Sequence, residues 1–388
     1  MNNTDNSANL QAECAVPASV EPVSTTPARA EILSLTSLRG LLAAWVVLYH
    51  FWNETLKLFP DLESFSPIAQ VGNMAVPAFF MLSGYVLSYN YAERFKQLSW
   101  KAVRQFLWLR LARVYPVHLF TLLIVLAMVL VSGRLGYQLT DSGYSTRDFI
   151  LNLFLLQTWV PEYQLNWNYP AWSISSEWFA YLLFPLMATA AMRWVKTRAV
   201  AVACALLFLL GSVAFTLFCR PWPFYELLLV VPTFLAGAVL YWVFQNAVAT
   251  GSLGARRTIP ECLVLAILAV CFIPDWHSQI GALLVLLYLL IAFLVWLRER
   301  CSVLWTCKPA VFLGEVSYSL YMTHTLAQKI LIRLLPAARF EERGWAVRLG
   351  IILVYIVTIA AGCLATYFLV ERPCRRLFKK VLASKPTP

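Results

Sequence analysis

Seven ionisable side chains interrupt long apolar stretches of this 388-residue sequence: Arg39, His50, His118, Glu177, Glu315, His324 and Lys329. An ionisable group in a membrane-length apolar segment is costly and usually faces a cavity or a partner. A buried arginine requires a phosphate or a carboxylate, and a histidine can accept a proton near neutral pH. The set therefore offers groups for binding an anion and for acid–base chemistry.

Arg39 and His50 are eleven residues apart on one predicted helix. At 100° and 1.5 Å per residue they differ by only about 20° in azimuth and by roughly 16 Å along the axis. One helix face thus carries a cation near one side of the membrane and an imidazole near the other side. The alternative is an arginine that reaches the interface and a histidine satisfied within the core.

Glu177 lies in the segment Ala171–Tyr181, at a depth that we expect to be similar to that of His50. A carboxylate there could orient the imidazole or bind an acceptor hydroxyl. The alternative is a residue of the helix start near the headgroups, a position that Ser173 and Ser176 equally suggest.

The segment Gly314–Thr325 is unusually polar for a membrane span and includes Tyr318 and His324. Its hydroxyl groups and its histidine could line a cavity. Hydrogen bonding between helices by Ser, Thr and Tyr side chains is the alternative.

The elements that position these residues are predicted to be membrane helices. Hydrophobic residues make up 60% of the chain and charged residues only 13%, about half the charge of a soluble domain. We expect an all-α, polytopic membrane protein, because each crossing needs about 20 apolar residues. The expected spans, about ten, lie near 33–53, 72–91, 106–132, 171–192, 199–219, 224–245, 259–274, 279–297, 309–335 and 346–370.

The net charge of +11 comes from basic clusters in short loops, which are typical of topology signals and not of nucleic-acid binding. Most of these clusters fall on the side of both termini. We therefore expect a multi-pass protein of a cell membrane, a bacterial inner membrane, with cytoplasmic termini. Three regions follow: a disordered tail over 1–30, a membrane domain over 31–376 and a basic cytoplasmic tail over 377–388.

In this layout residues 133–170 form the largest extracytoplasmic loop. Residues 148–160 within it are too short to span, and we expect them to be re-entrant or interfacial. The loop is rich in aromatic residues, including Trp167 and Tyr169, and Trp172 follows it. Aromatic faces beside Asn and Gln suit stacking on sugar rings. An aromatic belt at the membrane surface is the alternative.

Six motifs, in order along residues 34–376, resemble those of the membrane acyltransferase family 3. They are Leu38–Leu41 continuing to Leu48–His50, Val76–Tyr85, Arg110–Pro116, Trp172–Glu177, Val316–Tyr321 with His324, and Glu371–Pro373. The resemblance implies about ten helices and an acyltransferase of the EC 2.3.1 type. Relatives move an acyl group, often acetyl from acetyl-CoA, to a hydroxyl of an extracytoplasmic carbohydrate. His118 departs from the family pattern; we place it near the cytoplasmic side and assign it no catalytic role.

Together the residues and the resemblance suggest a mechanism. Arg39, Arg110 and Arg113 would bind the phosphates of cytosolic acyl-CoA at the inner face. His50 would act as general base, or form a transient acyl-histidine, and Glu177 would orient it or the acceptor. The expected acceptor side consists of Trp167, Tyr169, Trp172, Tyr318 and His324. No metal and no tightly bound cofactor is expected.

A transporter or flippase of a glycan or lipid-linked intermediate is the competing hypothesis. It would use His50, Glu177 and His324 as a proton relay without acyl transfer. Such proteins are often built from inverted repeats with broken helices, and the sequence shows no such repeat.

Overall fold

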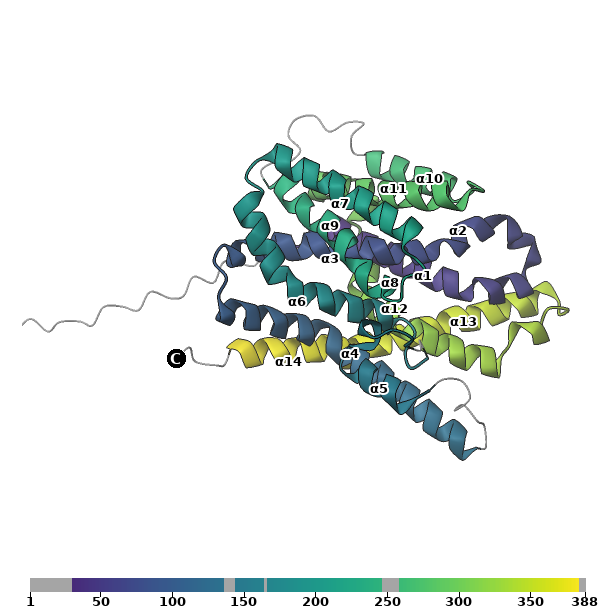
Figure 1. Cartoon of the computed structure of the whole chain (residues 1–388). Coiled ribbons are helices and arrows are strands. Elements are labelled where there is room, and N and C mark those ends of the chain that lie inside the picture. Colours follow the sequence, from purple (N-terminus) through teal and green to yellow (C-terminus); the bar gives the residue numbers. More distant parts are fainter. Residues whose placement is uncertain (1–29, 136–143, 164–165, 246–257, 384–388) are drawn as a thin grey trace, which may run out of the picture. The chain divides into compact units, whose positions relative to one another are not determined.

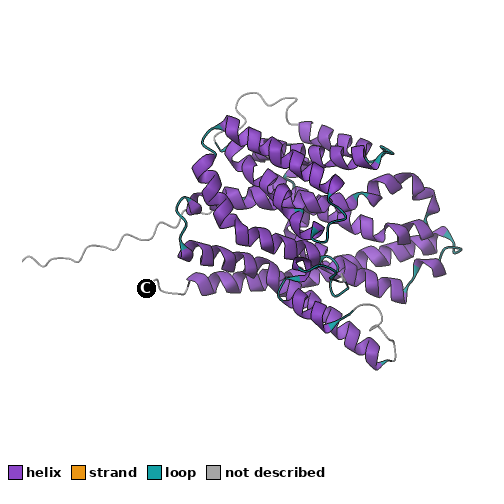
Figure 2. Ribbon diagram, viewed as in Figure 1, coloured by secondary structure: helices purple, strands orange, loops and turns teal. Residues whose placement is uncertain are grey.

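The computed structural model describes residues 30–135, 144–163, 166–245 and 258–383, and within these ranges the secondary structure is helical with no strand (Figure 2). The predicted all-α class is therefore confirmed. The predicted tail over residues 1–29, residues 384–388, and residues 136–143 and 164–165 of the predicted outer loop lie outside the described residues.

Each predicted span coincides with helical structure to within a few residues (Figure 1). The long helices are α1 (Leu33–Leu58), α3 (Ala75–Tyr91), α4 (Trp100–Arg134), α6 (Ala171–Trp194), α7 (Arg198–Phe218), α9 (Val230–Phe244), α10 (Ile259–Val270), α11 (Trp276–Leu297), α12 (Lys308–Leu334) and α13 (Trp345–Thr366). A π-helical turn, η10 (Tyr367–Glu371), joins α13 to α14 (Arg372–Ala383). The last helix therefore extends into the segment that was expected to be a tail.

Seven helical segments among the described residues are long and apolar enough to cross a membrane. They are Leu33–Leu58, Pro60–Phe95, Trp100–Arg134, Arg198–Phe218, Tyr225–Phe244, Trp276–Leu297 and Trp345–Phe378. This confirms a multi-pass membrane protein, although the number falls short of ten. The helices α6 and α12 have the length but are more polar, and α10 has only 12 residues.

Short polar side chains mark the starts of several helices. Ser99 accepts a hydrogen bond from the Ala102 amide at 3.3 Å and so caps α4. The Asp275 carboxylate accepts one from the Ser278 amide at 2.8 Å and caps α11. Each cap satisfies a backbone N–H that has no partner within its own helix.

Two glycines allow α1 and α12 to pack in close contact along their length. A Cβ added to Gly40 would lie 2.7 Å from the Gly314 nitrogen, and one added to Gly314 would collide with the Thr36 carbonyl oxygen. Small residues at such contacts let helix backbones approach closely in a membrane protein. His50 and His324 each lie ten residues beyond these glycines. Because the helices run parallel there, the glycine contact brings the two histidines to the same level.

A second glycine contact joins α3 to α9. A Cβ on Gly84 would collide with the Phe234 carbonyl oxygen, and one on Gly237 would collide with the Met81 carbonyl oxygen. Val76 of α3 lines two neighbouring pockets of the candidate active site, so this contact holds one wall of the site in place.

The segment between α4 and α6 packs onto the helices at several points. It contains α5 (Thr146–Leu153) and the short turn Gln157–Trp159. Ser175 donates a hydrogen bond to the Leu155 carbonyl at 2.7 Å, and Lys329 donates one to Tyr144 and one to the Asn166 carbonyl, both at 2.9 Å. The described part of the loop is thus tied to α6 and α12.

His118 belongs to the same junction. Its Nε2–H donates to the Asn152 carbonyl at 2.7 Å, and its ring is fully buried. Asn152 lies on α5, so this hydrogen bond ties the middle of α4 to the segment between α4 and α6, and the placement of His118 near the cytoplasmic side stays a prediction.

Replacement of Gly314 by Ala is expected to destabilise the protein, because the added methyl group meets the backbone of α1 and overpacking costs about 1–3 kcal/mol. Thermal unfolding of the purified protein in detergent measures the effect. The control is Gly350→Ala on α13, where an added Cβ meets no atom within 4 Å. Equal melting temperatures for the two variants would contradict the proposed contact.

Candidate active site

Three pockets adjoin one another along α1 and α12. The arginine pocket is lined by Glu31, Thr36, Arg39, Arg113, Glu315, Tyr367, Arg372, Arg375 and Arg376. The central pocket shares Arg39 and Arg113 with it, and the histidine pocket shares Val76 and Tyr321 with the central one. The shared residues show that the three form a row.

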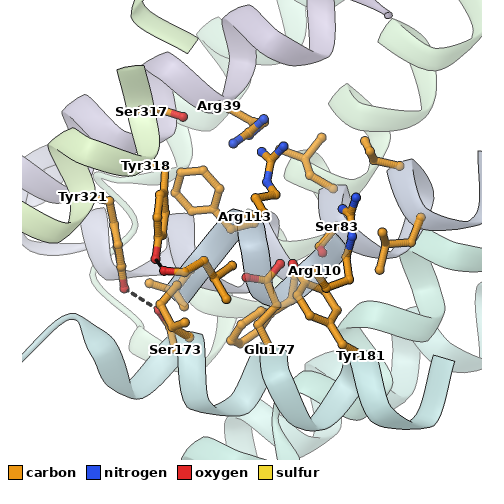
Figure 3. A pocket seen from close by; sticks show the side chains of 18 residues that line it. Arg39, Ser83, Arg110, Arg113, Ser173, Glu177, Tyr181, Ser317, Tyr318 and Tyr321 are labelled. Carbon is orange, nitrogen blue, oxygen red and sulfur yellow. Dashed lines mark hydrogen bonds between the residues drawn. The ribbon is translucent and has the colours of Figure 1, made fainter. Parts of the chain in front are cut away.

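The pockets differ in size. The arginine and histidine pockets measure about 250 and 300 Å³, whereas the central pocket measures about 110 Å³. Tyr321 lines both the central and histidine pockets, and its hydroxyl is 2.8 Å from the Ser173 hydroxyl (Figure 3). The free volume of the row is therefore smallest in the middle, at the central pocket.

The central pocket brings Arg39, Arg110 and Arg113 together with Glu177 (Figure 3). Arg110 donates a hydrogen bond to the Tyr91 hydroxyl at 2.8 Å and lies over that ring at 5.0 Å. None of these three arginines pairs with a carboxylate within 4.0 Å in the described part of the chain. They are consequently available to an anion.

The expected pairing of Glu177 with His50 is not found. On α6, Ser173, Glu177 and Tyr181 are spaced four residues apart and line the central pocket together, whereas the neighbouring Trp172 lines the histidine pocket. The carboxylate of Glu177 thus faces the arginines. His50 has another ionisable neighbour instead.

That neighbour is His324. The two imidazole rings are 4.9 Å apart between centroids and tilted by 47°. The Nδ1–H of His324 donates to the Tyr321 carbonyl at 2.7 Å, which leaves a lone pair on Nε2. This Nε2 atom is buried and has no hydrogen-bond partner among the described residues. His50 in turn is held through its carbonyl, which accepts a hydrogen bond from Gln328.

Aromatic residues surround the two histidines. The ring of Tyr169 is 5.3 Å from His50, and Trp172 lines the same pocket. Burial raises the pKa of the Tyr169 hydroxyl, so it remains a neutral donor and acceptor over the physiological range. Tyr318 lines the central pocket, and its hydroxyl donates to the Val114 carbonyl at 2.5 Å.

Trp167 is the one predicted site residue that lines none of the three pockets. Its indole N–H donates to the Ser145 carbonyl at 2.8 Å, and its ring packs 4.8 Å from that of Phe149. Only 4% of its surface is exposed, so it supports the loop from within.

Several pocket residues were not predicted. In the histidine pocket they are Tyr49, Asn73, Thr216, Arg220, Tyr225, Glu226 and Trp276. In the arginine pocket they include Arg372, Arg375 and Arg376, to which the sequence analysis assigned no binding role. Arg220 lies between two predicted spans and Glu226 at the start of the second, but their distance along the chain from His50 hides their common location.

Comparison with known families matches residues 32–367 to the acyltransferase 3 family, described as "Acyltransferase domain". Acyltransferase MdmB of Streptomyces mycarofaciens is 26% identical over 92% of this chain and 95% of its own length. ORF330 of Acidianus two-tailed virus, whose name proposes an acetyltransferase, is 26% identical over 76% of this chain and 83% of its own. No solved structure gives a significant match.

The family match covers most of the chain and contains α1, the central and histidine pockets and both histidines. It supports a transferase of the EC 2.3.1 type over a transporter without chemistry. The chain belongs to the acyltransferase 3 family of membrane acyltransferases.

Proposed function

We propose that the protein transfers an acyl group, acetyl in the simplest case, from cytosolic acyl-CoA to a hydroxyl of an extracytoplasmic carbohydrate. The row of three pockets carries this proposal, because it joins a cation-lined end to a pair of imidazoles through a small central pocket. An anionic donor with a long, thin arm fits such a path.

The donor would bind with its arm in the central pocket. Arg39 and Arg113 lie where the central pocket meets the arginine pocket and would hold phosphate oxygens. Arg110 is already held by Tyr91 and would line the arm. Glu177 would balance the charge of these arginines, a role that differs from the orientation of His50.

The reaction would take place in the histidine pocket. His50 takes the proton of the acceptor hydroxyl as that oxygen attacks the thioester carbonyl. The new C–O ester bond forms, the C–S bond breaks, and the proton returns from His50 to the departing thiolate. No net proton is gained or lost.

His324 is suited to assist His50. Its Nε2 lone pair is buried and unpaired among the described residues, 4.9 Å from His50 between ring centroids. It could accept a hydrogen bond from the protonated His50 and so stabilise the imidazolium at the moment of attack. His324 would thus act as a positioning residue.

The remaining walls of the histidine pocket favour a carbohydrate acceptor. Tyr169, Trp172 and Trp276 provide ring faces, and Glu226 and Arg220 provide a carboxylate and a guanidinium for hydroxyl groups. Aromatic faces beside polar groups suit sugar rings. Trp167 would contribute indirectly, by supporting the loop that presents Tyr169.

The predicted layout of ten crossings with cytoplasmic termini fits this function. The helices α6 and α12 owe part of their polarity to pocket-lining side chains such as Ser173, Glu177 and Ser317, so their composition does not exclude a crossing. The arginine pocket would then open to the cytoplasm and the histidine pocket to the exterior.

Orientation is tested with single cysteines in a background from which all nine native cysteines are removed. In intact cells an impermeant maleimide is expected to label a cysteine replacing Glu342, an exposed residue of the predicted outer loop before α13. It should label Lys196→Cys, also exposed, only after lysis. Labelling of Lys196→Cys alone in intact cells would reverse the proposed topology.

Replacement of Arg39 by Gln is expected to raise the donor KM by about tenfold or more, because a charge-assisted hydrogen bond to phosphate is lost. Acetyl transfer by the purified variant, measured over a range of acetyl-CoA concentrations, gives this value. Arg134→Gln, at the far end of α4 and outside the three pockets, is the control. An unchanged donor KM for Arg39→Gln would exclude the phosphate role.

Replacement of His50 by Ala is expected to lower transfer of labelled acetyl from acetyl-CoA to glycan by about 10²- to 10⁴-fold, the usual contribution of a general base. Donor binding should persist, because the arginines are unchanged. His324→Ala should lose less activity and His324→Gln less still, since an amide can still accept a hydrogen bond.

The control for the histidine variants is His277→Ala, an exposed histidine outside the three pockets. Near-normal turnover of His50→Ala together with an inactive His324→Ala would assign the general base to His324. Failure of the native protein to transfer acetyl to any glycan would contradict the proposed function itself.

A further inference from the structure

The arginine pocket carries more positive charge than Arg39 and Arg113 alone, the two residues proposed to bind phosphate, would supply. Five arginines line it, and they come from α1, α4 and α14. Glu31 and Glu315 also line it, but Glu31 accepts a hydrogen bond from Thr36 at 2.6 Å. Even with both carboxylates ionised, the lining residues carry an excess of positive charge. The pocket is therefore suited to an anion of more than one charge.

A buried carboxylate, Glu371, holds the start of α14 and thus the three arginines of its first turns. Glu371, at the end of the π-helical turn, is 3% exposed and accepts a hydrogen bond from Ser319 of α12 at 2.7 Å. Its other oxygen lies 3.4 Å from Arg375. This buried carboxylate fixes the start of α14 against α12, and so determines where the arginines of the first turns point.

Arg372 and Arg376 differ from Arg375 in their partners. Neither has a carboxylate within 4.0 Å in the described part of the chain, although the Arg372 guanidinium lies 5.9 Å from the Phe368 ring. They are four residues apart and thus share one face of α14. Two guanidinium groups on one face provide the fork geometry that a phosphate monoester accepts.

The distance from His50 to the arginine pocket indicates which phosphate group of acyl-CoA would reach Arg372 and Arg376. Arg39 and His50 are separated by roughly 16 Å along α1. The pantetheine arm, about a dozen bonds from its phosphate oxygen to its sulfur, spans roughly 14 Å when extended like a peptide chain. A thioester at His50 would therefore place the diphosphate at Arg39 and Arg113. The adenosine and its 3′-phosphate would lie beyond them, in the arginine pocket.

We infer that the arginine pocket binds the 3′-phosphoadenosine end of the acyl-CoA donor, with Arg376 and Arg372 contacting the 3′-phosphate. This inference rests on the proposed function, because it takes acyl-CoA as the donor. It assigns to the C-terminal helix a part in donor recognition that is separate from the roles of Arg39 and Arg113.

The test compares acetyl-CoA with acetyl-dephospho-CoA, which lacks only the 3′-phosphate. The full chain is purified in phosphatidylcholine-containing detergent micelles, and kcat/KM is measured with each donor. The native protein is expected to prefer acetyl-CoA by about tenfold, the effect of one or two charge-assisted hydrogen bonds. In Arg376→Gln this preference should fall to about twofold or less, while kcat/KM for the dephospho donor stays near the native value.

Arg376 is chosen over Arg375 because replacing Arg375 would leave the buried Glu371 without its cation. The matched control is Lys380→Gln, which removes the same charge from the same helix at a residue outside the pocket. The control should keep the native preference. Loss of the preference in both variants would reveal a diffuse charge effect and overturn the assigned site.

The remaining outcomes separate the two proposals. If neither donor supports transfer by the native protein, the proposed function fails. If both donors are used equally well by the native protein, or if Arg376→Gln keeps the tenfold preference, the proposed function stands and this inference fails. A lipid phosphate in the pocket would give no donor preference in the native protein and a higher donor KM when phosphatidylglycerol is added.

Discussion

The close contact between Gly40 of α1 and Gly314 of α12 is the constraint on which the site depends. With no room for a Cβ on either residue, the two backbones are fixed in both distance and register. On two parallel helices, residues at the same distance from these glycines lie at the same height, so that His50 lies next to His324. Arg39 and Ser317, which lie close to these glycines on the two helices, both line the central pocket. Acid–base groups and cations are thus positioned by a packing contact that contains neither.

Two of the helices that build the site, α6 and α12, carry many polar side chains along their length. On α12, Ser319, Tyr321 and Thr323 would be expensive in lipid, but each makes a hydrogen bond within the protein. On α6, Ser173 and Ser175 do the same. These two helices are the long ones that composition does not select as spans. In these two helices, both of which line pockets, the departure from apolarity is therefore matched by hydrogen bonds inside the protein.

Much of the fold and part of the site could be predicted from the sequence. The helices could be predicted because apolar length is a local property, although only seven helical segments among the described residues qualify as spans. The shared face of Arg39 and His50 could be predicted because helical spacing is local too. The ionisable partner of His50 could not be predicted from the sequence. Both Glu177 and His324 are plausible partners until the rotation of α6 about its axis is known. The place of Trp167 could not be predicted for a related reason: aromatic composition does not distinguish a ring that faces a pocket from one that supports a loop. The arginines of α14 lie more than 250 residues from Arg113 and Arg39 along the chain, so the sequence does not reveal their common pocket.

The small central pocket of the row has a consequence for the membrane itself. A water-filled path between the two faces would dissipate the ion gradients on which a cell depends. The central pocket is only about 110 Å³, and Tyr321 and Ser173 are hydrogen-bonded where it meets the histidine pocket. Three arginines in its wall place positive charge there, which opposes the entry of cations. The residues around the central pocket can therefore limit the flow of ions across the bilayer. During turnover, the thioester arm of a bound donor would itself fill this pocket.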